Sequence, residues 1–201
     1  SALYQAQTQR AVQNFQISPT PMPPGFIAAL LLIKQAAAHS NKALGLLSAE
    51  IAAAISKAAA TQLAAPDLTQ FPVPVYQTGS GTSSNMNVNE VLATMASQTL
   101  GQPVHPNDHV NLGQSSNDTV PTAIHVSAVL AIRRQLLPAL QQLVAAIGAQ
   151  SAMSGAVLKT GRTHLMDAMP VTFAQVYAGW QAQLTHAETL LAEQLPRLQQ
   201  L

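Results

Sequence analysis

The chain has 201 residues, of which only 8% are charged, and its net charge is +1. Without a cluster of Lys and Arg it is not expected to bind nucleic acid, and no run of 18 apolar residues suggests a membrane span. Soluble domains usually carry about 25% charged residues, so we expect other protein to cover much of this surface. The chain has no cysteine, which is compatible with a reducing compartment and with any other.

The first third of the chain is predicted to hold two helices. Residues 1–16 are polar and Gln-rich, and we expect an extended arm or short hairpin there rather than a helix. After a proline-rich break, Ala-rich helices are predicted from residue 26 and from residue 49, the second capped by Ser48 and ending before Pro66. Residues 67–76 carry alternating prolines, which predict an extended segment.

Three loops rich in glycine, hydroxyls and amides follow, each predicted to precede a helix. Residues 78–87 lead to a helix from about Val88 to Leu100 that Gly101 would cap. Residues 104–117 lead to a long helix with Asn117 and Asp118 as N-cap types, and residues 161–170 lead to a helix near Val171. An ordinary N-cap explains any one loop, but three such loops favour sites for a carboxylate or phosphate.

The last third is predicted to consist of long helices. Pro138 would kink the first of them, and Ser154-Gly155 is a candidate break. Apolar residues from Phe173 to Leu198 alternate steps of four and three, which is typical of a helix packed against nearly parallel neighbours. The predicted fold is all-α, with an N-terminal domain over residues 1–117 and the beginning of a helical bundle over residues 118–201.

Four segments carry a resemblance to a known family: TGSGTSSNMNVNEV, HPNDHVN, QSSNDTVPTAIH and GRTHLMDAMP. In this order they resemble signatures of the class II fumarase branch of the fumarase/aspartase superfamily, and the match covers nearly the whole chain. The resemblance implies a fumarate hydratase that converts fumarate and (S)-malate in the tricarboxylic acid cycle. It further implies a homotetramer with composite active sites, no cofactor, and a cytoplasmic location, or the mitochondrial matrix in a eukaryote.

The resemblance also implies roles for particular residues. His164 falls on the family's catalytic histidine, which exchanges a proton with the departing or attacking water. A second dicarboxylate site is expected at His105, Pro106, Asn107 and Asp108, although fewer residues precede it than in the family. His105 and His109 are not expected to bind a metal, because a proline separates them in a loop. The substrate-binding positions are Ser80, Thr82, Ser115, Ser116, Asn117 and Thr163.

One family segment is missing from residues 1–201: the loop that supplies a serine base and a carboxylate-binding lysine. The chain therefore corresponds to an N-terminal portion, and alone it is expected to be inactive. Two alternatives stay open. One is an aspartate ammonia-lyase, although that branch typically has Gln at the position of His164; the other is a non-catalytic helical assembly module or dicarboxylate binder.

Overall fold

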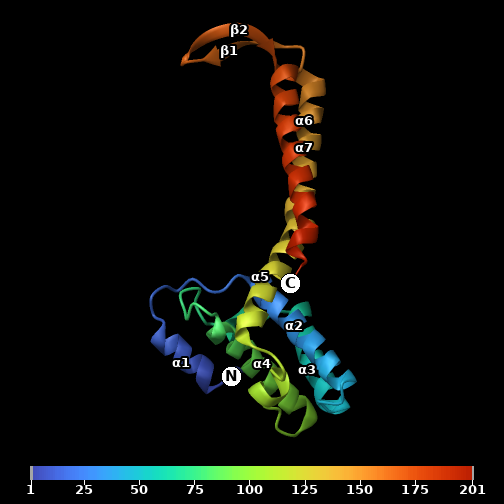
Figure 1. The fold of residues 1–201 in the computed structure, drawn as a ribbon. Coiled ribbons are helices and arrows are strands. Elements are labelled where there is room, and N and C mark those ends of the chain that lie inside the picture. Colours follow the sequence, from blue (N-terminus) through green and yellow to red (C-terminus); the bar gives the residue numbers. More distant parts are fainter. Residues whose placement is uncertain (1, 201) are drawn as a thin grey trace. The chain divides into compact units, whose positions relative to one another are not determined.

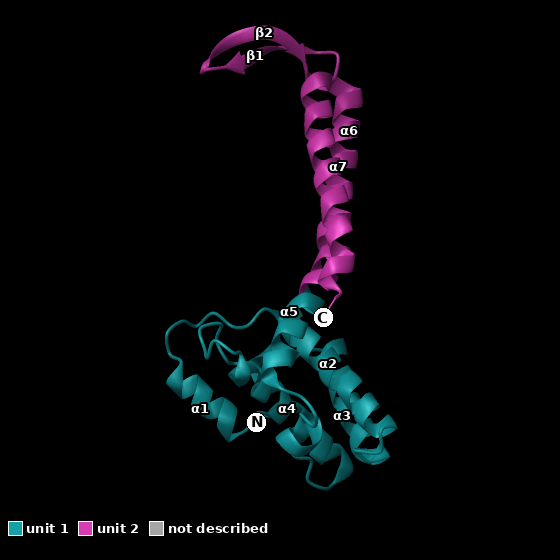
Figure 2. Cartoon of the chain, viewed as in Figure 1, with its two compact units in different colours: residues 1–127 teal, residues 128–201 magenta. Residues whose placement is uncertain are grey.

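The computed structural model describes residues 2–200, and these form helices joined by loops and one two-stranded sheet (Figure 1). The all-α fold class is thus confirmed. The chain folds as two compact units, Ser1–Ser127 and Ala128–Leu201 (Figure 2). This division falls within helix α5 (Ser116–Ala131), whereas the domain boundary predicted after residue 117 lies at the beginning of that helix.

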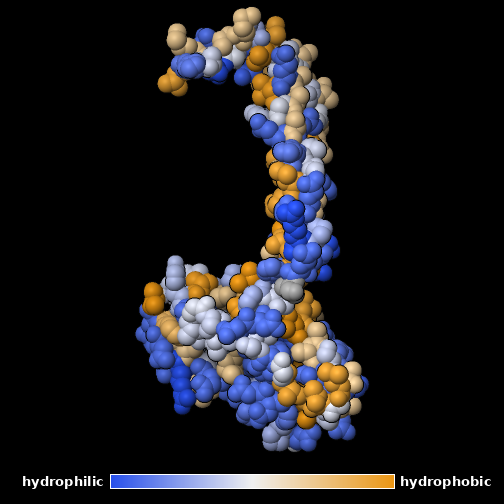
Figure 3. All heavy atoms as spheres, viewed as in Figure 1, coloured by the Kyte–Doolittle hydropathy of each residue, from blue (hydrophilic) through white to orange (hydrophobic). Residues whose placement is uncertain are grey.

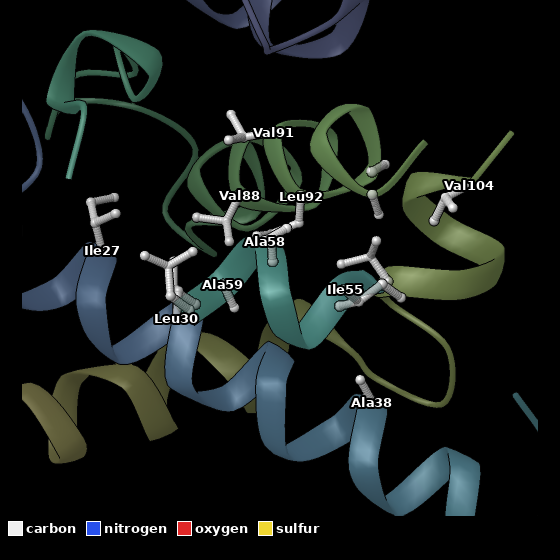
Figure 4. Packing of buried hydrophobic residues seen from close by; sticks show 14 of the residues in the cluster. Ile27, Leu30, Ala38, Ile55, Ala58, Ala59, Val88, Val91, Leu92 and Val104 are labelled. Carbon is white, nitrogen blue, oxygen red and sulfur yellow. The ribbon is translucent and has the colours of Figure 1, made fainter. Parts of the chain in front are cut away.

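Three helices build the core of the first unit: α2 (Pro24–Ala43), α3 (Ala49–Ala64) and α4 (Thr82–Leu100). The predictions for α2 and α3 are confirmed, including the Ser48 cap, whose Oγ accepts from the backbone N–H of Ile51 at 3.3 Å. Alanines let these helices approach closely, and larger aliphatic side chains fill the space between them. Figure 4 labels Ile27 and Leu30 of α2, Ile55, Ala58 and Ala59 of α3, and Val88, Val91 and Leu92 of α4 among the buried residues.

Helix α1 (Ala6–Asn14) occupies the segment that was predicted to be an extended arm, so that prediction is wrong. The Gln5 side chain does not cap this helix; Glu90 of α4 does, and it is 2% exposed. Its carboxylate accepts backbone N–H groups from Gln5 at 2.8 Å, Gln7 at 2.9 Å and Thr8 at 3.1 Å. A carboxylate at the positive end of a helix is stabilising. This cap comes from a distant part of the chain, and a local pattern does not reveal it.

Helix α4 begins at Thr82, not near Val88 as predicted, while its end at Gly101 (φ +69°) agrees with the prediction. The misplaced beginning has a physical reason: the polar residues of the first turns are buried and hydrogen-bonded instead of solvated. Asn87 Nδ2 donates to the backbone carbonyl of Gln70 at 2.9 Å, at the end of the short 3₁₀ helix η1 (Leu68–Gln70) that interrupts the predicted extended segment.

A helical stretch runs from Ser116 to Ser154 and consists of α5, the π-helical turn η3 (Ile132–Leu136) and α6 (Leu137–Ser154). The irregularity lies just before Pro138, where a kink was predicted, because proline lacks an N–H and crowds the preceding turn. By length and composition this stretch could cross a membrane, with a mean hydropathy of 1.2 in its most apolar window. One such helix is weak evidence, since core helices of soluble proteins pass the same test.

The second unit pairs α6 with α7 (Phe173–Leu198), and a β-hairpin lies between them in the sequence. Strands β1 (Leu158–Thr163) and β2 (Met166–Thr172) pair antiparallel. The third donor-rich loop is therefore a hairpin, which corrects the predicted loop, whereas the helix predicted to begin near Val171 is present and begins at Phe173. Thr172 caps it, with its Oγ1 accepting from Gln175 N and the Gln175 side chain accepting from Thr172 N.

The predicted apolar positions of α7 are mostly half-buried within this chain, and one of them is exposed. Trp180 is 51% exposed, and the only buried residue of α7 is Leu195 among those that the structure describes. The ring of Tyr177 lies 5.8 Å from that of Phe173 and 5.7 Å from that of Trp180, between centroids. Figure 3 shows apolar side chains at the surface along this helical pair.

Candidate functional site

Three predicted substrate-binding residues meet in the first unit. The hydroxyl oxygens of Ser80 and Thr82 lie 2.9 Å apart, and those of Thr82 and Ser116 lie 3.0 Å apart. Thr82 is the first residue of α4 and Ser116 the first residue of α5, so two helix N-termini converge here. Unpaired N–H groups and the helix dipole make each N-terminus favourable for an anion. We name Ser80, Thr82 and Ser116 the hydroxyl cluster.

Gly81 allows the two helices to approach. Its backbone has φ +67°, and a Cβ atom placed on it would lie 2.9 Å from Cγ1 and 3.0 Å from Cγ2 of Val120 in α5. Only glycine adopts this conformation readily and leaves room for the valine. The loop of residues 78–81, which we call the glycine loop, is therefore closely packed against the first turns of α5.

The start of α5 places the remaining two residues of the loop beside the cluster. Ser115 Oγ accepts from the backbone N–H of Asn117 at 3.2 Å, which is the N-cap contact. Ser115, rather than the predicted Asn117 or Asp118, thus caps the helix. The Asn117 side chain is exposed. Pro121 lies inside the helix and has no N–H to donate to the carbonyl of Asn117.

A buried polar network lies behind this loop, and the sequence did not predict it. Lys34 of α2 is 0% exposed, and its Nζ donates to Asn111 Oδ1 at 2.8 Å and to Gln114 Oε1 at 2.9 Å. Burial lowers the pKa of Lys34 from 10.5 to about 7. The sequence does contain one sign of this network, because Lys34 interrupts the mostly apolar run of residues 26–38.

The predicted second dicarboxylate site forms a π-helical turn, η2 (Pro106–Val110), instead of a loop. His105 Nδ1 accepts the backbone N–H groups of Asn107 at 3.3 Å and Asp108 at 3.1 Å. Oδ2 of Asp108 lies 3.1 Å from the same nitrogen, and both side chains are more than half exposed. His109 Nδ1 accepts from the backbone N–H of His105 at 2.9 Å. The imidazole nitrogens nearest the backbone thus act as caps of this turn.

Thr163 and His164 lie in the second unit, at the end of the β-hairpin. Thr163 pairs with Met166, so His164 and Leu165 form a two-residue turn, and both have positive φ, 50° and 60°. Turns of this kind usually carry Asn-Gly or other residues that tolerate positive φ, so a histidine and a leucine here are under backbone strain. The side chain of His164 is exposed, and Leu165 is fully exposed at 106%. The structure thus presents the predicted catalytic residue at the tip of a hairpin.

Comparison with known proteins agrees with these motifs. A family described as "Lyase" matches residues 1–201. The class II fumarate hydratase of Xylella fastidiosa is 57% identical over 200 residues, which cover 100% of this chain and 42% of that protein. One from Pseudomonas aeruginosa is 54% identical and is covered over 44% of its length. The chain therefore spans less than half the length of these relatives.

Solved structures give the same result for the fold. The recombinant class II fumarase of Schistosoma mansoni superposes with a TM-score of 0.93 at 39% identity, over 98% of this chain and 43% of that one. A structure described as fumarate lyase:delta crystallin from Brucella melitensis gives 0.92 at 39% identity, over 98% of this chain and 47% of that one. The chain belongs to the lyase family, the family of the class II fumarases that its sequence resembles.

Proposed function

We propose that this chain contributes to a fumarate hydratase, which adds water across the double bond of fumarate to give (S)-malate and catalyses the reverse reaction. The observation that carries the proposal is the hydroxyl cluster at the two converging helix N-termini. Relatives named fumarate hydratase class II, at 54–57% identity, support it. The place of this reaction in the tricarboxylic acid cycle belongs to the same proposal.

The chemistry of the reaction explains why donors are needed. When malate loses water, a proton leaves the carbon beside one carboxylate, the electron pair moves onto that carboxylate, and the hydroxyl on the neighbouring carbon then departs with a proton as water. The intermediate carries an additional negative charge, which fixed hydrogen-bond donors stabilise better than mobile water does. Ser80, Thr82 and Ser116 offer hydroxyl donors, and Asn117 offers an amide.

Within this proposal His164 exchanges the proton of the departing or attacking water. Imidazole suits that task because its unperturbed pKa, about 6.5, lies near working pH. Its exposed position at the hairpin tip leaves the ring accessible to a substrate. Thr163, which immediately precedes it, would contribute a further hydroxyl to substrate binding.

Assembly is part of the proposal. We propose a homotetramer with composite active sites, in a cytoplasmic location, and the charged fraction of 8% supports burial of much of the helical surface. The uncovered apolar side chains of α6 and α7, among them Trp180 and Leu143 at 51% and 47% exposure, support the same assembly. Sedimentation of the protein made from its complete reading frame tests it, and a monomer at micromolar concentration contradicts it.

The activity is tested on the protein made from its complete reading frame, by the absorbance of fumarate. We expect His164→Gln to lower kcat by roughly 10² to 10⁴, with fumarate affinity largely kept, because a lost proton relay affects the transition state more than binding. The matched control is His186→Gln, an exposed histidine of α7 in the same unit, which should leave kcat unchanged. If His164→Gln keeps full turnover and only loses stability, His164 has a structural role.

The same assay separates the alternatives. Ammonia offered together with fumarate would yield aspartate if the protein were an ammonia-lyase, and malate alone supports the hydratase. Fumarate binding without any turnover would leave a dicarboxylate-binding module as the remaining reading.

A further inference from the structure

Lys34 is a charged residue where the fold of the first unit needs an apolar one. It lies in the middle of α2, is 0% exposed, and is flanked along the chain by Ile33 and by the alanines at 36–38. Within residues 2–200 the only pair of a carboxylate and a basic group within 4 Å is His105 with Asp108, so no described carboxylate neutralises Lys34. Burying such a group is unfavourable unless it is paired, so its presence here calls for a role other than packing.

The partners of Lys34 are two amide oxygens on the segment that leads into α5. Nζ lies 2.8 Å from Asn111 Oδ1 and 2.9 Å from Gln114 Oε1. Nζ donates to both of these oxygens, so both amides direct their oxygens toward Lys34. Their nitrogens are then free to donate elsewhere, and each has one orientation only.

The nitrogens of these two amides hold the backbone of the segment. Asn111 Nδ2 donates to the carbonyl of Gln114 at 3.0 Å, and Gln114 Nε2 donates to the carbonyl of Val110 at 3.0 Å. Gln114 is the residue immediately before Ser115, the cap of α5. The contact with Lys34 therefore determines the path of the chain one residue before the predicted substrate-binding loop.

Two asparagines of α4 extend the network toward the other side of the cluster. Asn111 Oδ1 also accepts from Asn85 Nδ2 at 3.1 Å and from Asn89 Nδ2 at 3.2 Å. Asn85 Oδ1 in turn accepts from Thr119 Oγ1 of α5 at 3.3 Å. The same oxygen that Lys34 contacts thus connects α4 with α5, the two helices whose first residues carry Thr82 and Ser116.

We propose that Lys34 is a positioning residue, which orients the amides of Asn111 and Gln114 and thereby holds Ser115, Ser116 and Asn117 in the geometry that binds a substrate carboxylate. This inference rests on the proposed function of that loop. Lys34 acts from beneath the loop through the two amides and need not touch the substrate. Burial at this position disfavours the charged form of Lys34 and lowers its pKa to about 7.

The test is Lys34→Met in the protein made from its complete reading frame, with steady-state fumarate hydration and thermal unfolding measured side by side. Methionine keeps an unbranched side chain that ends at the Cε position, one atom short of Nζ, and gives the two amides no donor. We expect kcat/KM to fall on the order of 100-fold, mainly through a higher KM, at temperatures where the variant stays folded. Lys57→Met, an exposed lysine of α3, removes the same charge from the same unit and should leave KM unchanged.

A purely structural role would lower the unfolding temperature and leave the KM of the folded protein as it was. A folded Lys34→Met protein whose KM equals that of Lys57→Met overturns the inference. If Lys34→Met does not fold, Gln114→Leu is the second test, because it removes one of the two oxygens that accept from Lys34, and Gln114 is only half-buried. An unchanged KM in Gln114→Leu also overturns the inference. If the unsubstituted protein does not hydrate fumarate, the proposed function itself fails, and this inference falls with it.

Discussion

Replacing Gly81 with alanine tests whether the close approach of the glycine loop to α5 builds the hydroxyl cluster. The backbone at Gly81 has φ +67°, and an alanine Cβ would lie 2.9 Å and 3.0 Å from the two methyl carbons of Val120. Positive φ costs an alanine roughly 1–2 kcal/mol, and forcing a methyl group into a filled space costs about 1–3 kcal/mol more. We therefore expect Gly81→Ala to reduce the free energy of unfolding by about 2–5 kcal/mol.

Gly101→Ala separates the two contributions. Gly101 has almost the same backbone conformation, φ +69°, but no atom lies within 4 Å of a Cβ placed there. Both substitutions also remove the same conformational entropy from the unfolded chain, so that effect cancels in the comparison. Urea unfolding of the two variants should differ by about 1–3 kcal/mol, which is the cost of the contact with Val120.

Activity measurements on the two variants connect this contact with the site. Relief of the contact requires the loop to move away from α5, which would lengthen the 3.0 Å distance between the Thr82 and Ser116 hydroxyls. We expect a higher KM for fumarate in Gly81→Ala and an unchanged one in Gly101→Ala. If both variants lose equal stability and keep the same KM, the Val120 side chain moves aside without measurable cost. The reasoning that this contact builds the hydroxyl cluster is then refuted.

Two further predictions concern buried charged groups of the first unit. The pKa of Lys34 is lowered to about 7 from 10.5, so between these values the unfolded chain holds a proton that the folded chain has lost, and this group makes the folded state more stable as pH rises. Lys34→Met should remove that contribution, up to about 1.4 kcal/mol per pH unit, from urea unfolding measured between pH 7 and 10; equal slopes in the two proteins would contradict the burial of a lysine with a lowered pKa. Glu90→Gln should destabilise the protein by about 2–3 kcal/mol, because an amide cannot accept all three N–H groups at the start of α1. Faster amide hydrogen exchange at Gln7 and Thr8 would confirm the local effect, and unchanged exchange there would show that α1 does not depend on this cap.

Much of the helical framework could be predicted from the sequence because the signals are local. The caps at Ser48 and Gly101 and the break after Ser154 each depend on one or two residues, and the structure confirms them. The irregular turn before Pro138 follows from the missing N–H of proline in the same way. The candidate site residues were found through their resemblance to family motifs, which requires no knowledge of contacts.

The structure corrected the predictions where polar residues are buried or where a turn breaks its usual preferences. The first turns of α4 contain buried asparagines, and a polar stretch of this kind resembles a loop until its partners are known. The turn at His164 and Leu165 carries two non-glycine residues with positive φ, so no turn signal marks the hairpin. Strand pairing then determines the conformation of these residues against their own preference.

The sequence by itself determined the helical class, most helix positions and the identity of the candidate site residues. Only the tertiary structure decided that Ser80, Thr82 and Ser116 share one hydrogen-bonded cluster, that Gly81 must be a glycine for two reasons, and that Lys34 lies under the loop. The physical reason is distance along the chain: helix periodicity and capping act over a few residues. The contacts of Thr82 with Ser116 and of Lys34 with Gln114 join residues 34 and 80 positions apart, and they exist only after the helices have packed.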